Sequence, residues 1–377
     1  MKKDSEIITV LQLRRQLSLL ARSIRHSTLL SNQNLSAAQE VIDDTIYFEG
    51  KFQARRRILL LSRGCSIATC TMCPLPNEAL SNAAQISAQQ LIQQFDAGFY
   101  QKKTHDFEVL TIYNNGNFFA QLEIPLEVRE HIYQSVSQSS VKTLIVESLP
   151  QFITNNELEI AKKLLGKCKL MVAIGLQSSN DLIREVAINT ICTKQHFEQA
   201  TRLLSAFNYK SLVFLMVKPP FITESEAIED AVTSVRYLGL LGINEAILCP
   251  TKIDEATIVN LLFQRKLYSP PWLWSVIEIL KQIYQHNTNH PARIATSLLD
   301  SNRQTTSLTA KNCSKCTERV IKIIEEFNMT KNLAVLDSIR CDCYSTYQEQ
   351  IAKENQIYGS IPIEKRASNF ISNYYSK

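Results

Sequence analysis

The chain has 377 residues, of which 45% are hydrophobic and 20% charged. This composition is typical of a globular protein and excludes a disordered chain, a collagen and a coiled coil. The net charge of +5 and the pI near 8.6 neither require nor exclude a nucleic-acid partner. No apolar run approaches the roughly 18 residues of a membrane helix, and no secretory signal is recognised, so we predict a cytoplasmic protein without membrane contacts.

An amphipathic helix is predicted for residues 7–30, because apolar residues recur there at helical spacing while arginines occupy the other faces. We expect this helix to pack across the main domain, within an N-terminal helical segment of residues 1–50. The alternative is a basic arm that faces RNA. Its arginines and the basic stretch 51–57 could hold phosphates.

Six short runs rich in Val, Ile and Leu predict strands buried in a parallel sheet: residues 57–62, 108–114, 143–148, 170–176, 211–217 and 245–251. Longer amphipathic segments with helix-start signals separate them, which is the alternation of βα units. The predicted fold is therefore α/β, a partial (β/α)6 TIM-like barrel over residues 51–284. In such barrels the chemistry lies at the carboxyl ends of the strands.

Residues 285–377 are polar and predict a small C-terminal Cys-rich module. It contains Cys313, Cys316, Cys341 and Cys343, two pairs at a separation typical of a four-cysteine zinc site. An auxiliary iron–sulfur cluster would use the same thiolates, and a module without metal is the third alternative.

Another cysteine set directly follows the first strand of the barrel, where Cys65, Cys70 and Cys73 form a Cys-x4-Cys-x2-Cys pattern. Three thiolates on one short loop match a 4Fe–4S cluster in which the fourth iron is left open. Such an open iron is what chelation of S-adenosylmethionine (SAM) requires. The alternative is a zinc loop that takes a distant fourth ligand.

Several further segments accompany this loop: YNNGNFF, IVESLPQFIT, AIGLQSSNDLIRE, INTICTKQHFEQA, LVFLMVKPPFITESEAI and YSPPWLWSV. Over roughly residues 55–280 the chain resembles radical SAM enzymes. More narrowly, it resembles the branch of the elongator-complex catalytic subunit and the archaeosine-synthase radical SAM subunit. The resemblance implies a 4Fe–4S cluster that reductively cleaves SAM to a 5′-deoxyadenosyl radical. The archaeosine-type relatives cleave a C–N bond in a lysine adduct on a deazaguanine base of tRNA.

The resemblance also implies SAM-binding residues, with departures from the family pattern. The commonest cysteine spacing in the family is Cys-x3-Cys-x2-Cys. Met72 stands where an aromatic residue often lies by the adenine. Asn115, Gly116 and Asn117 replace the usual Gly-Gly-Glu that meets the SAM amino group.

Four polar residues at later strand ends complete the predicted site. Glu147, Gln177 and Ser178 resemble the family's contacts to the SAM ribose and carboxylate. Lys218 would be costly to bury unpaired, so we expect it to pair with Glu147 or to contact an anionic group of the substrate or of SAM. Lys218 and Glu147 are the predicted catalytic residues.

These observations predict a radical SAM enzyme of lyase or transferase type that modifies a tRNA base or a related nucleobase. It would need an electron donor such as flavodoxin or ferredoxin, and a partner enzyme could supply its substrate. Two alternatives stay open: a radical SAM enzyme for a small-molecule or carrier-bound intermediate, and a non-catalytic zinc and RNA-binding protein.

Overall fold

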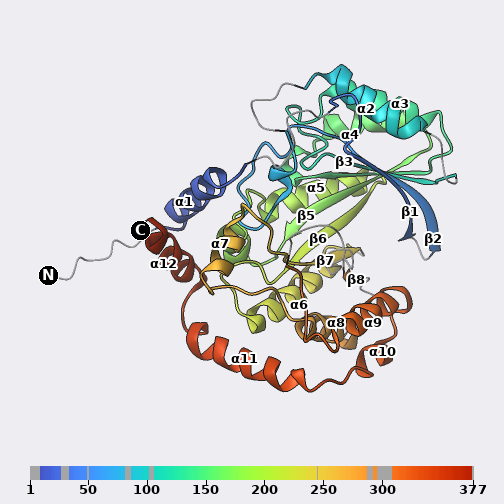
Figure 1. Cartoon of the computed structure of the whole chain (residues 1–377). Helices are drawn as coiled ribbons and strands as arrows, with labels where there is room; N and C mark the ends of the chain where they lie inside the picture. Colours follow the sequence, from blue (N-terminus) through green and yellow to red (C-terminus); the bar gives the residue numbers. More distant parts are fainter. Residues whose placement is uncertain are drawn as a thin grey trace.

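A single curled sheet of eight strands in chain order forms the centre of the computed structural model, and helices cover its outer face (Figure 1). The structure describes residues 9–26, 34–48, 51–80, 86–101, 106–243, 245–286, 292–294 and 308–375. The strands are β1 (Glu40–Phe48), β2 (Lys51–Leu59), β3 (Val109–Tyr113), β4 (Thr143–Ser148), β5 (Lys169–Gln177), β6 (Lys210–Val217), β7 (Ala246–Pro250) and β8 (Ala292–Ile294). β1 is antiparallel to β2, and every later pair of neighbours is parallel.

The predicted partial α/β barrel is confirmed, and its six predicted strands correspond to β2–β7. The prediction missed β1 and β8. β1 carries Asp43 and Asp44 in mid-strand, where carboxylates disfavour a strand prediction. They are accommodated because the register places them opposite Arg56 and Arg55 of β2. β8 has three residues, too few for a recognisable pattern.

The basic stretch 51–57 is not a free phosphate-binding surface. Arg56 is fully buried, with its Nε 2.7 Å from Asp43 Oδ1, and Arg55 and Arg57 both pair with Asp44. Carboxylates of β1 therefore already neutralise these arginines, and phosphate binding by this stretch stays a prediction.

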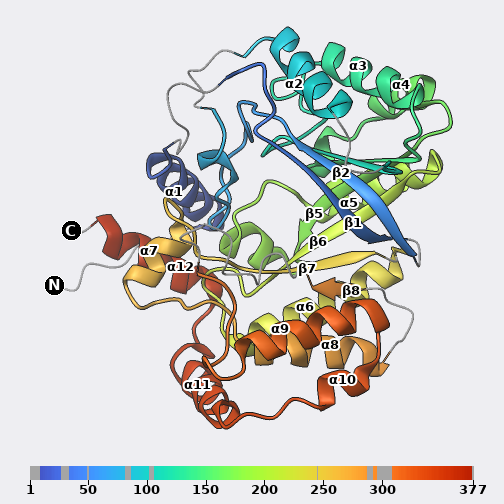
Figure 2. The same cartoon turned by 45° about the vertical axis from the view of Figure 1, so that its right-hand side comes forward.

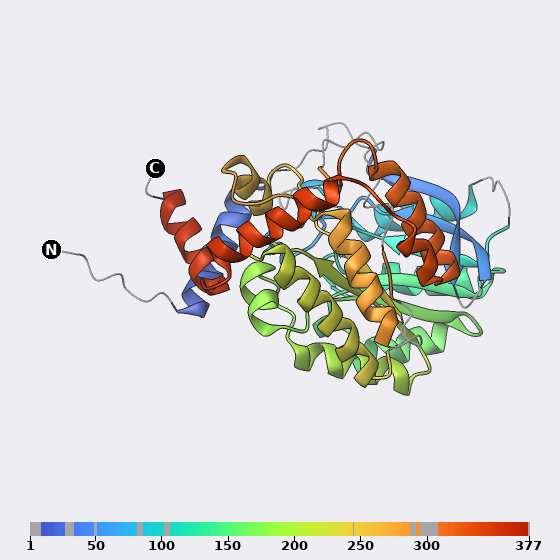
Figure 3. The ribbon, with the colours of Figure 1, turned by 90° about the horizontal axis from the view of Figure 1, so that it is seen from below.

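Helices cover the convex face of the sheet, as the turned views show (Figures 2 and 3). They are α2 (Ala88–Tyr100), α3 (Leu126–Ser137), α4 (Asn155–Leu165), α5 (Lys194–Ala206), α6 (Glu224–Leu240) and α8 (Leu273–His286). Leu144 and Val146 of β4 pack beneath them, whereas Ile145 belongs to a smaller cluster on the concave face. The alternation of a strand therefore directs Glu147, two residues after Ile145, toward the concave side.

A second hydrophobic cluster lies at the carboxyl ends of the parallel strands and joins α1 (Val10–Ser23), α7 (Ile258–Gln264) and α12 (Ile363–Tyr375). These three helices lie together on the left of Figure 1. α1 realises the predicted N-terminal helix and begins at a capping box of Thr9 and Gln12. Residues 7–8 and 27–30 of the prediction lie outside the described residues.

The C-terminal part adds α9 (Thr317–Thr330), α10 (Leu333–Asp337) and α11 (Cys343–Tyr358) before α12. The short helical turns are η1 (Leu75–Asn77), η2 (Pro150–Phe152) and the π-helical η3 (Ile183–Ala187). Across the described ranges, every helix is too short or too polar to cross a membrane. The boundaries at residues 50 and 284 stay predictions, since β1 and β8 join the same sheet as the barrel strands.

Candidate functional site

The loop after β2 carries Cys65, Cys70 and Cys73 at the carboxyl edge of the sheet, where it is held by three other connections. Cys65 N donates to Asn115 O at 3.0 Å, after β3. Thr71 N donates to Ile188 O at 3.0 Å, and Val259 N of α7 donates to Thr71 O at 3.1 Å. The position of the cysteine loop therefore depends on the segments after β3, β5 and β7.

The three cysteines are partly buried, and their thiols influence one another. Burial, together with the neighbouring Cys65, raises the pKa of Cys70 to about 12. Burial also raises the pKa of Cys73, with contributions from both other thiols. Three thiolates would therefore be unstable here without a cationic centre between them.

Three thiols on one short loop can hold an iron–sulfur cluster in which one iron has no protein ligand. The described residues also contain a second set of metal-ligating side chains, the four C-terminal cysteines, whose sulfurs lie within 4.8 Å of one another.

The loop after β3 braces Cys65. Asn117 Nδ2 donates to Glu123 Oε1 at 2.9 Å and lies 3.6 Å from Cys65 Sγ, while Glu123 Oε1 accepts from Ser66 N at 2.8 Å. Gly116 allows this approach, because a Cβ there would lie 2.9 Å from Cys65 N. Asn115 has a left-handed φ of 53° and donates its amide to Glu78 O.

Gln177 at the end of β5 has an unsatisfied acceptor on the concave face. Its φ is 70°, and its amide folds over Gly175, where a Cβ would lie 2.2 Å from Gln177 Nε2. Gln177 Oε1 is buried without a hydrogen-bond partner among the described residues. Such an orphan acceptor is costly unless a ligand donates to it, so Gln177 is suited to bind a hydroxyl or amino group.

Ser178 points away from that space. Its Oγ donates to Asp230 Oδ1 of α6 at 2.6 Å. Burial raises the pKa of Asp230 to about 7, and the bond from Ser178 opposes that shift. The structure therefore gives Ser178 a contact to the outer helix layer, and its predicted SAM contact stays a prediction.

Glu147 shares the concave space with Tyr113 of β3 and Cys249 of β7. Burial alone raises the pKa of Glu147 to about 7. Burial and the Glu147 carboxylate together raise the pKa values of Tyr113 and Cys249 to about 12 each. A carboxylate of this kind can hold a proton or bind a cation near neutral pH.

Lys218, immediately after β6, does not pair with Glu147 as one expectation had it. Its Nζ donates to Glu224 Oε1 at 2.7 Å and lies 3.6 Å from Glu354 Oε1 of α11. Lys218 is 2% exposed, and its φ of 53° is left-handed. The ammonium is neutralised by these carboxylates, because the positive φ turns Lys218 out of the strand alternation.

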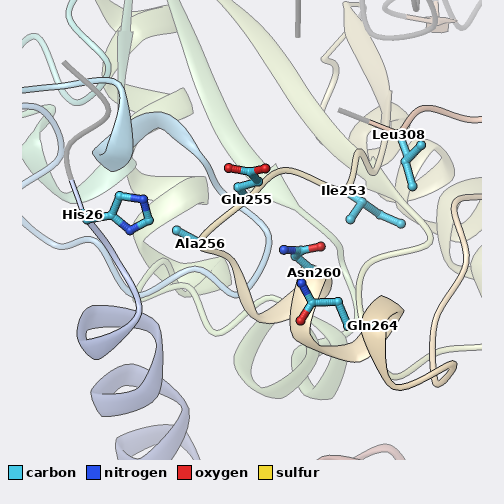
Figure 4. Close-up of a pocket in the computed structure, with 7 residues that line it drawn as sticks. All are labelled: His26, Ile253, Glu255, Ala256, Asn260, Gln264 and Leu308. Atoms are coloured by element: carbon cyan, nitrogen blue, oxygen red, sulfur yellow. The ribbon is translucent and has the colours of Figure 1, made fainter. Parts of the chain in front are cut away.

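Met72 is buried in the cluster of α1, α7 and α12. A cavity of about 340 Å³ lies beside the cysteine loop and is lined by His26, Ile253, Glu255, Ala256, Asn260, Gln264 and Leu308 (Figure 4). Asn77 connects its wall to the loop, since its Nδ2 donates to Glu255 O at 3.3 Å. The predicted site residues do not line this cavity.

The four C-terminal cysteines converge as predicted. Their sulfurs lie within 4.8 Å of one another, with separations of 3.7 Å for Cys313–Cys316 and 3.6 Å for Cys313–Cys341 and Cys316–Cys343. Cys316 and Cys343 stand at the first turns of α9 and α11, where the helix dipole favours thiolates. Trp274 Nε1 donates to Cys343 Sγ at 3.3 Å, a typical support for a metal ligand. This set can bind a metal ion.

Comparisons with known proteins give relatives over most of the chain, although no family model matches. An uncharacterized protein of Methanocaldococcus jannaschii is 31% identical over 84% of this chain and 87% of its own length. Archaeosine synthase subunit beta of Methanosarcina acetivorans is 27% identical over 80% of this chain and 86% of its own length. The protein of the same name from Thermococcus kodakarensis is 27% identical over 63% of this chain and 72% of its own length.

The chain belongs to the same family as these relatives. Solved structures similar to the chain include archaeal Elp3 of Methanocaldococcus infernus without its N-terminus, with a TM-score of 0.45 and 17% identity over 64% of this chain and 58% of that one. Methylornithine synthase (PylB) has a TM-score of 0.46 and 12% identity over 90% of this chain and 96% of its own.

Sequence reasoning missed the contributions of Glu123, Tyr113 and Arg25 to this region. Glu123 is 1% exposed and hydrogen-bonds Asn117, but in the sequence it is a single carboxylate in a largely apolar loop without a recognisable motif. Tyr113 lies within a predicted strand and ends β3, and its alternation with Thr111 could have placed it on the concave face. Arg25 contacts the cysteine loop although it lies 45 residues away in the sequence, and no local sequence pattern indicates that contact.

Proposed function

We propose that this protein is a radical SAM enzyme that cleaves SAM reductively at a 4Fe–4S cluster held by Cys65, Cys70 and Cys73, in order to modify a tRNA base or related nucleobase by C–N bond cleavage. The observation that carries the proposal is the set of three partly buried thiols on one loop at the carboxyl edge of the sheet, where burial raises their pKa values. When bound, the cluster and SAM supply a 5′-deoxyadenosyl radical. The protein's own residues bind, orient and exclude water.

Two concave-face residues are proposed to act on the bound molecules. Gln177 accepts a hydrogen bond from a hydroxyl or amino group, which its orphan Oε1 favours. Glu147 holds a proton or binds a cationic group of the substrate, since its carboxyl lies in the same space with a pKa of about 7. Met72 and Asn115 remain proposed SAM contacts. Asn117 contributes through Cys65 and Glu123, whose bonds occupy its amide.

We assign Lys218 a positioning role rather than the catalytic one predicted from the sequence. Its ammonium bonds to Glu224, and Tyr268 Oη donates to Lys218 O at 2.6 Å. These contacts fix the segment after β6 at the carboxyl edge of the sheet.

Structural zinc is the proposed occupant of the C-terminal site. Zinc–thiolate bonds of about 2.3 Å in a tetrahedron place neighbouring sulfurs about 3.8 Å apart. The separations of 3.6–3.7 Å in the chain agree with that value, whereas an auxiliary iron–sulfur cluster would spread the four sulfurs further.

The substrate class follows from the relatives named archaeosine synthase subunit beta. We propose a deazaguanine-modified tRNA as the substrate. A second subunit or enzyme would supply it, and flavodoxin or ferredoxin would donate the electron.

The test is anaerobic reconstitution with iron and sulfide, reduction, addition of SAM and assay of 5′-deoxyadenosine. Cys70→Ala should abolish the product. Cys168→Ala, which removes a buried thiol on the outer side of the sheet, should retain it. Turnover of modified tRNA would support the proposed substrate class. Turnover of small molecules alone would show that the substrate is a small molecule instead. A colourless, zinc-only protein without SAM cleavage would overturn the enzyme proposal.

A further inference from the structure

Arg25, two residues beyond α1, places a cation against two of the three proposed cluster ligands. Its Nη2 donates to Cys70 O at 2.9 Å and to Cys73 O at 3.4 Å. The guanidinium also favours the thiolates, because its charge opposes the rise in pKa that burial causes at both cysteines.

The other terminal nitrogen of Arg25 lacks a partner. Nη1 is buried and has no hydrogen bond within the described part of the chain. A buried charged donor without an acceptor is costly, so its presence indicates an anionic group that completes the site. The nearby thiolates are where such a group would bind.

The position of Arg25 is built into the fold. Leu13, Leu17 and Leu20 of α1 are at most 1% exposed and pack in the cluster that includes α12 and η3. Arg22, one turn earlier, donates to Ile67 O of the same loop at 3.1 Å. Arg22 and Arg25 therefore anchor the cysteine loop to α1 at two points, and the charge of Arg25 also favours the thiolates of Cys70 and Cys73.

We infer that Arg25 is a positioning residue that raises the reduction potential of the cluster at Cys65, Cys70 and Cys73 and donates Nη1 to it. The inference rests on the proposed function. An oxidised cluster of core charge 2+ with three thiolates carries a net charge of −1. It takes one electron from an external one-electron reductant and becomes −2, and no bond breaks. A fixed cation stabilises the more negative state by the larger amount, so the reduced form gains.

Redox titration of the reconstituted enzyme, followed by the electron paramagnetic resonance signal of the reduced cluster, tests this inference with dithionite as reductant. We expect Arg25→Gln to lower the equilibrium constant for reduction roughly tenfold, about 59 mV for a one-electron couple. Arg25→Lys keeps the charge and should stay near the wild-type value. Arg22→Gln is the matched control, since it loosens the same loop without removing charge from the thiols.

Equal potentials for Arg25→Gln and wild type would overturn the inference, and so would an equal fall in Arg22→Gln, which would indicate loop packing instead. If Arg25→Gln retains no iron, Arg25→Lys decides, because a tenfold fall in that variant would exclude the charge as the cause. A failure of the proposed function would give a different result from a failure of this inference, because the wild-type protein itself would then show no reducible cluster.

Discussion

Replacing Glu224 by Gln should destabilise the protein through the buried Lys218. Glu224 is fully buried, and its carboxylate accepts from Lys218 Nζ at 2.7 Å and from Trp272 N at 3.2 Å. The amide keeps the shape but removes the charge. Removing one partner of a buried ion pair costs about 3–5 kcal/mol. We take the lower end, because Glu354 remains 3.6 Å from the ammonium.

A loss of about 3 kcal/mol corresponds to a fall of about 4 °C in Tm, since unfolding entropy near 2.1 cal/mol/K per residue gives about 0.8 kcal/mol/K for 377 residues. Differential scanning fluorimetry of the as-isolated protein measures it. Glu354→Gln is the matched control. Glu354 is 18% exposed and more distant, so about 1 °C is expected.

The double variant Lys218→Met with Glu224→Gln completes a thermodynamic cycle. Removing both charges should cost clearly less than the sum of the single changes, because no unpaired charge remains buried. Equal shifts for Glu224→Gln and Glu354→Gln, or additive losses in the double variant, would refute the reasoning that a buried ion pair fixes this segment.

Three further outcomes are expected. Gly116→Ala should reduce iron retention more than twofold, because its Cβ would push on Cys65 N, while Gly242→Ala, with no atom within 4 Å of its Cβ, should leave iron content unchanged. Cys341→Ser should remove about one zinc per chain, measured by elemental analysis, and lower Tm. Burial raises the pKa of Glu147 from 4.5 to about 7, so the destabilisation by its buried carboxylate is absent below about pH 4.5, grows between these values and is complete above about pH 7. Glu147→Gln should therefore raise Tm clearly more at about pH 8 than at about pH 5.

The sequence was informative wherever the signal is local. The cysteine spacing marked both cysteine sets, and runs of branched apolar residues marked β2–β7, because strands buried on both faces must be apolar throughout. β1 was not predicted, because the arginines of β2 that neutralise its mid-strand carboxylates lie opposite them only in the folded protein.

Side-chain partners at the strand ends were harder to predict. The sequence indicates that Lys218 needs a partner, but the partner comes from α6 and α11 rather than from β4. Positive φ angles at Asn115, Gln177 and Lys218 redirect these side chains, so strict alternation fails at the edge where the site lies. Strained backbone of this kind concentrates at functional sites, which explains why local rules lose accuracy there.

Two helices outside the βα units connect the chain ends to the proposed chemistry. α1 brings Arg25 to the carbonyls of Cys70 and Cys73. α11 begins at Cys343 in the four-cysteine set and carries Glu354 to the backbone N of Glu224 at 2.9 Å. A metal that fixes the start of α11 therefore also helps to fix the segment after β6. Removal of a metal from the four-cysteine set should therefore also loosen the segment after β6, at the carboxyl edge of the sheet, because α11 connects the two. This effect is expected although the four cysteines contribute no residue to the concave space.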